Sequence, residues 1–237
     1  MPQINESIEL TLKLSPPPFK PHSQVTCGLS TLFGMQGSIQ TECRVALVRH
    51  GRSSHVHAGW ITASGFRAWR EAYEAAGIRE DERVPAHLEQ LVGRADLVLS
   101  SDAARAVASA HLLAPGREIV VSSLLRELDL ESPTFGGLRL PLAAWALAVG
   151  GRTLFLTLRR QYPSAAEAAR VNNAAAWLED LAAQHSLIVA VTHASFRRRL
   201  STRLVQTGWQ AEPGHRSLQH WSAWLFRRRP SRSCSGA

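Results

Sequence analysis

The sequence predicts an α/β protein with a single three-layer domain, in which helices cover both faces of a mostly parallel sheet. Two observations lead to this fold class. From residue 44 onward, short apolar runs rich in β-branched residues alternate with longer segments of helical periodicity. The apolar runs are also continuous, as expected for parallel strands buried on both faces. In such sheets, ligands bind at the carboxyl ends of the strands.

The expected strands are the apolar runs of this pattern. The first contains the sequence VALV, and the fourth, LIVAVT, is the most apolar. Segment 221–226 is a candidate for the last strand. The expected strands are 44–49, 96–100, 118–121, 187–192 and 221–226.

Helices are expected between these strands. Segment 64–76 places large apolar residues at spacings of three and four, and a glycine follows it. Ser164 and Glu167 have the spacing of a capping box. Segment 138–158 is helix-like but is expected to break at Gly150-Gly151. The expected helices are 64–76, 88–92, 103–113, 138–158, 165–184 and 196–206.

The composition changes near residue 35. Both lysines of the 237-residue chain, Lys13 and Lys20, precede Met35, and three consecutive prolines lie in the same stretch. We therefore expect residues 1–34 to be a disordered leader, or residues that precede a true start at Met35. The predicted organisation is a domain over 35–228 and a basic tail over 229–237.

Composition also narrows the choice of compartment. No apolar run reaches the roughly 18 to 20 residues that a membrane span needs. No basic segment followed by an apolar stretch marks a secretory signal. The three cysteines fit neither a disulfide framework nor a zinc site. A cytoplasmic protein with no membrane partner is expected, and the oligomeric state stays open.

The net charge of +8 raises the question of nucleic-acid binding. The strongest basic runs are Arg197-Arg198-Arg199 and Arg227-Arg228-Arg229. Neither is interleaved with aromatic residues as a base-stacking platform would be. We favour a solvated helix face and a frayed tail, and no nucleic-acid partner.

Ionisable side chains follow the predicted strands. Arg49 and His50 come after the first strand, and Arg105 lies about one turn into the helix after the second. Glu127 lies near the third strand, and His193 directly follows the fourth. Because the carboxyl ends of parallel strands share one edge of a sheet, these five side chains are expected to meet there.

The chain resembles the histidine phosphatase superfamily, the phosphoglycerate-mutase-like group. The matching pieces are LVRHG at 47–51, SSDAARAVASA at 100–110, LRELDL at 125–130 and VTH at 191–193. Segment 112–128 is similar to the corresponding region of alpha-ribazole phosphatase-type members. The resemblance spans about residues 44–228 and implies a phosphoglycerate-mutase-like fold.

The resemblance implies a role for each of these residues. His50 would be the nucleophile that becomes phosphohistidine, and Glu127 would protonate the leaving oxygen and then help to activate water. Arg49, Arg105 and His193 would hold the phosphate oxygens. Guanidinium groups match the geometry of phosphate, and nearby arginines favour the neutral imidazole that a nucleophile needs. No metal or other cofactor is expected, because arginine and histidine supply the charge.

Structural interpretations of the same residues stay open. His50 could be a loop histidine, and His193 a buried structural one. Arg105 could pair with Asp102, three positions earlier. Glu127 could pair with Arg126 or Arg152 on the surface.

The chain also departs from the family pattern. Arg52 follows the glycine where an acidic or amide residue is common, whereas Ser53 matches and is a possible substrate contact. His55 and His57 have the spacing of metal ligands on a strand, but no acidic or cysteine ligand accompanies them. Most tryptophans are expected in the core, and Trp60 and Trp145 near a substrate cap.

The leading hypothesis is a metal-independent phosphomonoesterase that acts on a small phosphorylated substrate. A phosphoglycerate-mutase-type enzyme would return the phosphoryl group to its substrate, and it needs a larger closing segment. A catalytically weak relative that binds a phosphorylated ligand is the alternative from another class. A nucleic-acid-binding protein is a third, and its affinity would fall steeply with salt.

Overall fold

The computed structural model describes residues 42–56, 59–129, 137–159, 161–214 and 217–228. The expected leader, 1–34, and the expected tail, 229–237, lie outside these residues, and so does His57. Within the described part, the chain forms the α/β fold that the sequence predicts.

The central sheet has six strands in the order β4-β3-β6-β1-β8-β7. The pairings β4–β3, β3–β6 and β6–β1 are parallel, whereas β1–β8 and β8–β7 are antiparallel. The sheet is therefore mostly parallel, as predicted, with an antiparallel edge. Its strands are β1 (Cys43–Arg49), β3 (Leu97–Ser101), β4 (Val120–Ser122), β6 (Leu187–Thr192), β7 (Gln210–Ala211) and β8 (Ala223–Arg228).

The helices lie close to their predicted positions. The Ser164 hydroxyl accepts a hydrogen bond from the Glu167 backbone N–H, as the capping-box pattern predicts. The predicted break at Gly150-Gly151 is wrong, because α4 runs through both glycines. The helices are α1 (Ala63–Ala75), α2 (Ala86–Gly93), α3 (Ala104–Leu113), α4 (Leu142–Leu158), α5 (Ala165–Ala182) and α6 (Ala194–Gln206), with a 3-10 turn, η1, at Ser123–Leu125.

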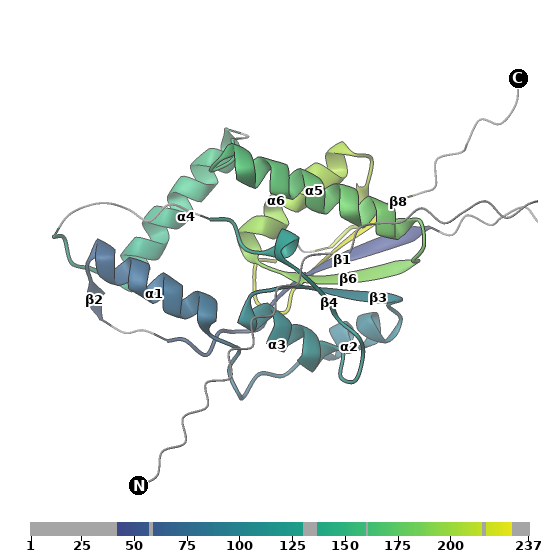
Figure 1. Ribbon diagram of the computed structural model, residues 1–237, viewed down its shortest axis with the longest axis horizontal. Helices are drawn as coiled ribbons and strands as arrows, with labels where there is room; N and C mark the ends of the chain where they lie inside the picture. The colour runs from purple at the N-terminus through teal and green to yellow at the C-terminus, as the bar shows by residue number, and fades with distance from the viewer. Residues whose placement is uncertain (1–41, 57–58, 130–136, 160, 215–216, 229–237) are drawn as a thin grey trace, which may run out of the picture. The chain divides into compact units, whose positions relative to one another are not determined.

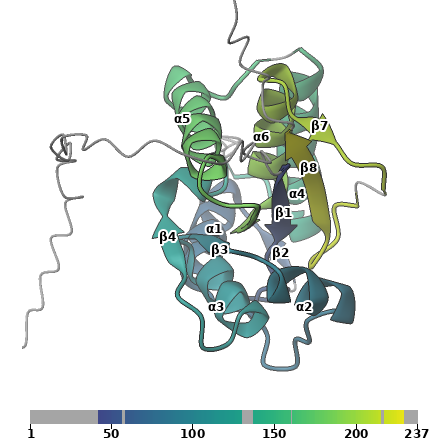
Figure 2. The same ribbon diagram turned by 90° about the vertical axis from the view of Figure 1, so that its right-hand side faces the viewer.

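Helices cover both faces of the sheet (Figure 1). Helices α5 and α6 cover one face, and α2 and α3 cover the other (Figure 2). Successive residues of β1 alternate between the two cores: Leu47 packs on the α5–α6 side and Val48 on the α2–α3 side. Burial on both faces explains why this strand reads as one continuous apolar run.

A smaller layer stands beside the sheet. It contains α1, α4 and a two-stranded ribbon of β2 (Trp60–Ile61) and β5 (Leu140–Pro141). Phe66 and Trp145 form its core, and the Trp145 indole N–H donates to the Ile61 carbonyl at 2.9 Å. Trp145 is buried, whereas Trp60 is largely exposed. The sequence pattern missed the ribbon because each strand has only two residues.

The run Arg197–Arg199 corrects the expectation of a solvated helix face. Arg197 and Arg199 are buried, and only Arg198 is partly exposed. The Arg197 guanidinium lies over the Trp224 ring and donates to the carbonyls of Leu47 and Ser217.

Among the described residues, no helix is long and apolar enough to cross a membrane.

The burial pattern predicts the stability of two leucine variants. Leu47 is fully buried in the core, so Leu47→Ala should lower the free energy of unfolding by about 2 to 5 kcal/mol. Leu147 on α4 is 76% exposed, so Leu147→Ala should change it by less than about 0.5 kcal/mol. Urea denaturation at constant m-value measures both, and equal losses would contradict this assignment of the core.

Candidate active site

The five side chains expected at the edge of the sheet come together there. Arg49 ends β1 and His50 follows it, Arg105 lies in the first turn of α3, and His193 directly precedes α6. Glu127 follows the 3-10 turn after β4. The ring centroids of His50 and His193 are 5.0 Å apart. Of the five side chains, all except that of His193 line one cavity of about 360 Å³.

The geometry of His50 determines which ring nitrogen carries its proton. Nδ1 lies 2.7 Å from the Gly51 carbonyl oxygen, which can only accept a hydrogen bond. Nδ1 therefore donates, and Nε2 of the neutral ring keeps its lone pair. The side chain is only 2% exposed. Burial, together with the charges of Arg105 and Arg49, holds the pKa of His50 well below its usual value, so the ring is neutral.

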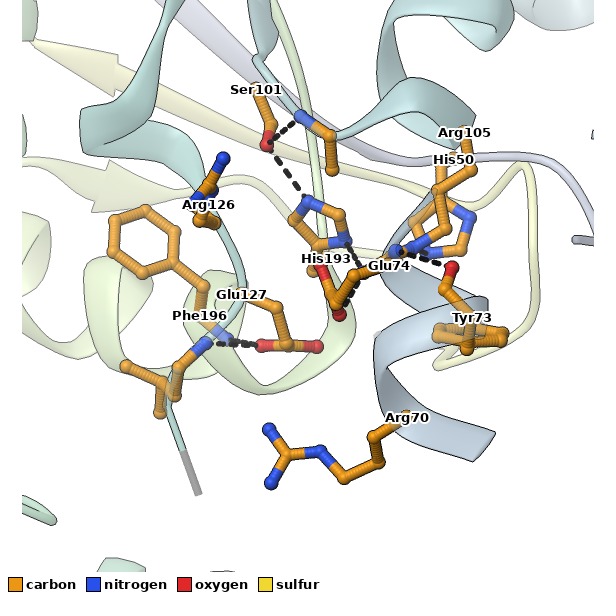
Figure 3. A network of polar contacts seen from close by, with 12 residues as sticks. His50, Arg70, Tyr73, Glu74, Ser101, Arg105, Arg126, Glu127, His193 and Phe196 are labelled. Atoms are coloured by element: carbon orange, nitrogen blue, oxygen red, sulfur yellow. Dashed lines mark hydrogen bonds and ion pairs between the residues drawn. The ribbon is translucent and has the colours of Figure 1, made fainter. Parts of the chain in front are cut away.

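The buried guanidinium of Arg105 connects both histidines to α1 (Figure 3). Its Nε donates to Nε2 of His50 at 3.3 Å, and its Nη2 lies 3.1 Å from Nδ1 of His193. It also donates to the Tyr73 carbonyl at 3.1 Å and to the Glu74 carboxylate at 3.0 Å. Arg105 is 1% exposed, so these contacts hold a full charge away from solvent.

His193 is fixed by partners on both ring nitrogens. Arg105 can only donate, so Nδ1 of His193 accepts and Nε2 carries the proton. That proton is donated to the Ser101 hydroxyl at the end of β3, at 2.9 Å. Burial, followed by the nearby His50 and Arg105, holds the pKa of His193 well below its usual value.

The Glu127 carboxylate sits at the N-terminus of α6. It accepts hydrogen bonds from the backbone N–H groups of Phe196 at 2.8 Å, Leu128 at 3.0 Å and Ser195 at 3.3 Å. Burial nevertheless outweighs these bonds and raises the pKa of Glu127. A carboxyl group with a raised pKa that borders the cavity can hold a proton and release it again.

Two of the three ion pairs considered from the sequence, Arg105–Asp102 and Glu127–Arg126, do not form. Arg126 donates to both carboxylate oxygens of Asp102, at 2.9 and 2.8 Å. Asp102 is therefore the partner of Arg126 and is not bonded to Arg105. Glu127 binds backbone amides and has no ion pair with Arg126.

Arg49 places a partly buried guanidinium in the cavity wall. Its Nη1 donates to the Leu218 carbonyl, in the loop before β8. Its Nε is buried and has no hydrogen-bond partner in the described part of the chain. Burial lowers the pKa of Arg49. A buried donor without an acceptor is costly, and a phosphate oxygen would supply the missing bond.

Several residues of the site could not be selected from the sequence. Tyr73 and Glu74 reach Arg105 from α1, and Tyr73 lies in the apolar stripe that predicted this helix. His220 has its ring 5.5 Å from that of His50. Burial, then the charge of Arg49, lowers the pKa of His220 to about 4. No strand pattern or motif marks this loop histidine.

Gly51 and Trp221 fix the backbone next to His50. A Cβ atom at Gly51 would lie 2.7 Å from the Trp221 ring, so only glycine fits there. Trp221 has φ +59°, the only positive φ of a non-glycine residue in the described chain. Its indole N–H donates to the buried Glu82 carboxylate, which Arg52 also binds. Such strain needs strong local support and is typical of functional sites.

The structure places Ser53 outside the wall of this cavity. Its hydroxyl accepts a hydrogen bond from the backbone N–H of His55 at 3.2 Å. Its contact with substrate therefore stays a prediction. Among the residues that the structure describes, no cluster of three or more histidine, cysteine, aspartate or glutamate residues could hold a metal ion.

Among known proteins, only solved structures are found to be similar to this chain. No family model matches the sequence, and no curated protein matches it. A mycobacterial glucosyl-3-phosphoglycerate phosphatase with inorganic phosphate is 19% identical, with a TM-score of 0.46 over 69% of this chain and 79% of its own. The protein called mycobacterial hydrolase 1 is 20% identical, with a TM-score of 0.45 over 70% and 82%.

A mutant phosphoserine phosphatase from Entamoeba histolytica, in complex with phosphoserine, is also similar. It is 17% identical, with a TM-score of 0.42 over 70% of this chain and 80% of its own. Two of these similar structures are thus phosphatases. Because the TM-scores are below 0.5, the function proposed below is based on the site itself.

The histidines with lowered pKa values predict how the free energy of unfolding depends on pH. The pKa values of His50, His193 and His220 are depressed in the folded protein, so the unfolded chain binds more protons below about pH 6.5. The free energy of unfolding should therefore fall between pH 7 and pH 5. The raised pKa of Glu127 acts in the opposite direction, because the folded state binds more protons as pH falls through that pKa.

Urea denaturation at pH 7 and pH 5 measures this dependence. His220→Gln removes one of the three depressed groups and should reduce the pH dependence while leaving stability at pH 7 nearly unchanged. An equal free energy of unfolding at the two pH values would show that the three rings are not held neutral.

Proposed function

We propose that this chain is a metal-independent phosphomonoester hydrolase that works through a phosphohistidine on Nε2 of His50. The observation that supports this most directly is the tautomer of His50. Nδ1 is committed to the Gly51 carbonyl, so the nucleophilic lone pair lies on Nε2, beside the Arg105 guanidinium. A neutral imidazole with a fixed lone pair next to a buried cation is suited to attack phosphorus.

In the first step, Nε2 of His50 attacks phosphorus as the bond to the bridging oxygen breaks. The leaving alkoxide takes a proton from Glu127, whose raised pKa keeps that proton available. The phosphoryl group stays on His50, and the neutral alcohol departs. A phosphate bound between the histidines would take hydrogen bonds from Arg105 in place of the present contact with His50.

In the second step, water attacks the phosphoryl group and the bond from phosphorus to Nε2 breaks. The Glu127 carboxylate accepts the proton of that water, and His50 recovers its lone pair. Inorganic phosphate leaves, and both side chains return to their starting states. The proton that Glu127 donates in the first step is thus restored to it in the second.

The remaining groups stabilise charge on the three equatorial oxygens. Arg49 offers its unpartnered Nε, and Arg105 offers a fork of donors. His193 can donate from Nδ1 once it is protonated, and the dianionic phosphate favours that proton. Two guanidinium groups and the imidazolium that His193 forms beside the phosphate thus supply the positive charge, so we propose no metal or cofactor for this chemistry.

We expect His50→Ala to abolish turnover. The variant has no nucleophile, so kcat for 4-nitrophenyl phosphate should fall at least about a thousandfold. Wild-type protein quenched during turnover of a labelled ester should contain an acid-labile, alkali-stable phosphoenzyme, and the variant should not. His111→Ala, at an exposed position on α3, is the control for a generic effect of histidine removal.

The same trapping experiment separates the alternatives. Hydrolysis releases inorganic phosphate, whereas a mutase retains the phosphoryl group and a binding protein forms no phosphoenzyme. A wild-type chain that binds phosphate esters without forming phosphohistidine would overturn the proposed function.

We expect Glu127→Gln to slow hydrolysis mainly for poor leaving groups. Glutamine cannot donate a proton to an alkoxide, so alkyl phosphates should lose about 100- to 10,000-fold in rate. Nitrophenolate leaves without a proton, so 4-nitrophenyl phosphate should be affected much less. The exposed Glu89→Gln on α2 is the matched control. Equal losses for alkyl and nitrophenyl esters would contradict the acid role.

A further inference from the structure

The outer part of the cavity has an aromatic wall supplied by α1. Phe66, Trp69 and Tyr73 line it, at the helical spacing of three and four residues. Their rings form a stacked ladder, with centroids 5.9 Å apart from Phe66 to Trp69 and 5.2 Å apart from Trp69 to Tyr73. The Arg105 guanidinium lies over the Tyr73 ring, so the ladder begins at the phosphate-holding groups.

Helix α4 supplies the facing wall. Ala146, Val149 and Gly150 line the cavity, which they can do together because residues three and four apart share one helix face. Leu147 points away from this face and is 76% exposed. Alanine and glycine leave room between α4 and the ladder, where larger side chains would fill the space.

Two charged side chains in the outer part of the cavity already have partners, whereas the buried Trp69 indole N–H has no hydrogen-bond partner among the described residues. Glu74 is paired with Arg105, and Arg70 lies 3.6 Å from Asp129. A leaving group with several hydroxyls would lose water there without gaining enough partners, which is costly. An apolar leaving group would instead gain from contact with the walls.

We propose that the substrate is a phosphomonoester of an apolar, ring-containing alcohol. This inference rests on the proposed function. Its phosphate lies against His50, and its carbon framework lies between the Trp69–Tyr73 ladder and Val149. The volume of about 360 Å³ suits a small ligand of this kind. An aromatic ring is favoured over a chain, because aromatic pairs gain more than buried area alone provides.

The first experiment compares benzyl phosphate with glycerol 1-phosphate. Their leaving alcohols are both primary and poor leaving groups, so a difference in rate reports on the walls more than on bond breaking. We expect kcat/KM to be at least about tenfold higher for benzyl phosphate. Equal values for the two esters would overturn the substrate class and leave the phosphatase activity standing.

A matched pair of variants on α4 tests the wall itself. Val149→Asn places an amide in the cavity and should reduce the preference for benzyl phosphate several-fold, mainly through KM. Leu147→Asn makes a similar change on the exposed face of the same helix and should retain the preference. If both variants keep the preference, or both lose it, the proposed wall is wrong.

Binding of inert analogues distinguishes failure of this inference from failure of the proposed function. Benzylphosphonate should bind at least about tenfold more tightly than methylphosphonate, as measured by calorimetry. If no ester is turned over but this preference holds, the hydrolase proposal fails and the apolar cavity stands. If esters are hydrolysed but the two phosphonates bind equally, the inference about the substrate class fails alone.

Discussion

The site depends on one buried guanidinium. Arg105 bonds both histidines, the backbone of α1 and the Glu74 carboxylate, so one side chain joins the sheet edge to the outer layer. Loss of this group would leave the acceptors on His50 and His193 unsatisfied in a buried place. An arginine is suited to this position because its donors form a rigid fork and it stays charged when buried.

The charge of Arg105 favours the neutral forms of the two histidines beside it. Burial and two arginines favour the neutral form of His50, and the Gly51 carbonyl then selects the tautomer with an unprotonated Nε2, which accepts from Arg105. Glu127 is affected differently, because burial raises its pKa although two amides at the start of α6 and the amide of Leu128 oppose that rise. One compact region thus holds a neutral imidazole and a carboxyl group with a raised pKa, the pair of groups that the proposed two-step chemistry needs.

Sequence reasoning predicted the parts of the site that follow strands. Arg49, His50 and His193 are adjacent to buried apolar runs, so the topology of a parallel sheet was enough to bring them together. Tyr73 and His220 could not be found in this way. Tyr73 belongs to an apolar helix stripe, and the sequence pattern does not distinguish it from the other residues of that stripe. Its backbone carbonyl, and not its hydroxyl, accepts the hydrogen bond from Arg105. His220 lies in an irregular loop, and tertiary bonds from Arg197 and Arg49 hold that loop in place.

Helix α1 contributes both to the position of Arg105 and to the wall of the cavity. Its backbone and Glu74 hold Arg105, while its ring ladder forms the wall that faces α4. A shift of α1 that widened the cavity would therefore also move the Arg105 donors that face the two histidines. Because packed rings resist small displacements, the ladder fixes the position of Arg105 as well as the shape of the cavity. Under the proposed function, the fit of a leaving group against this wall is thus coupled directly to the geometry around His50.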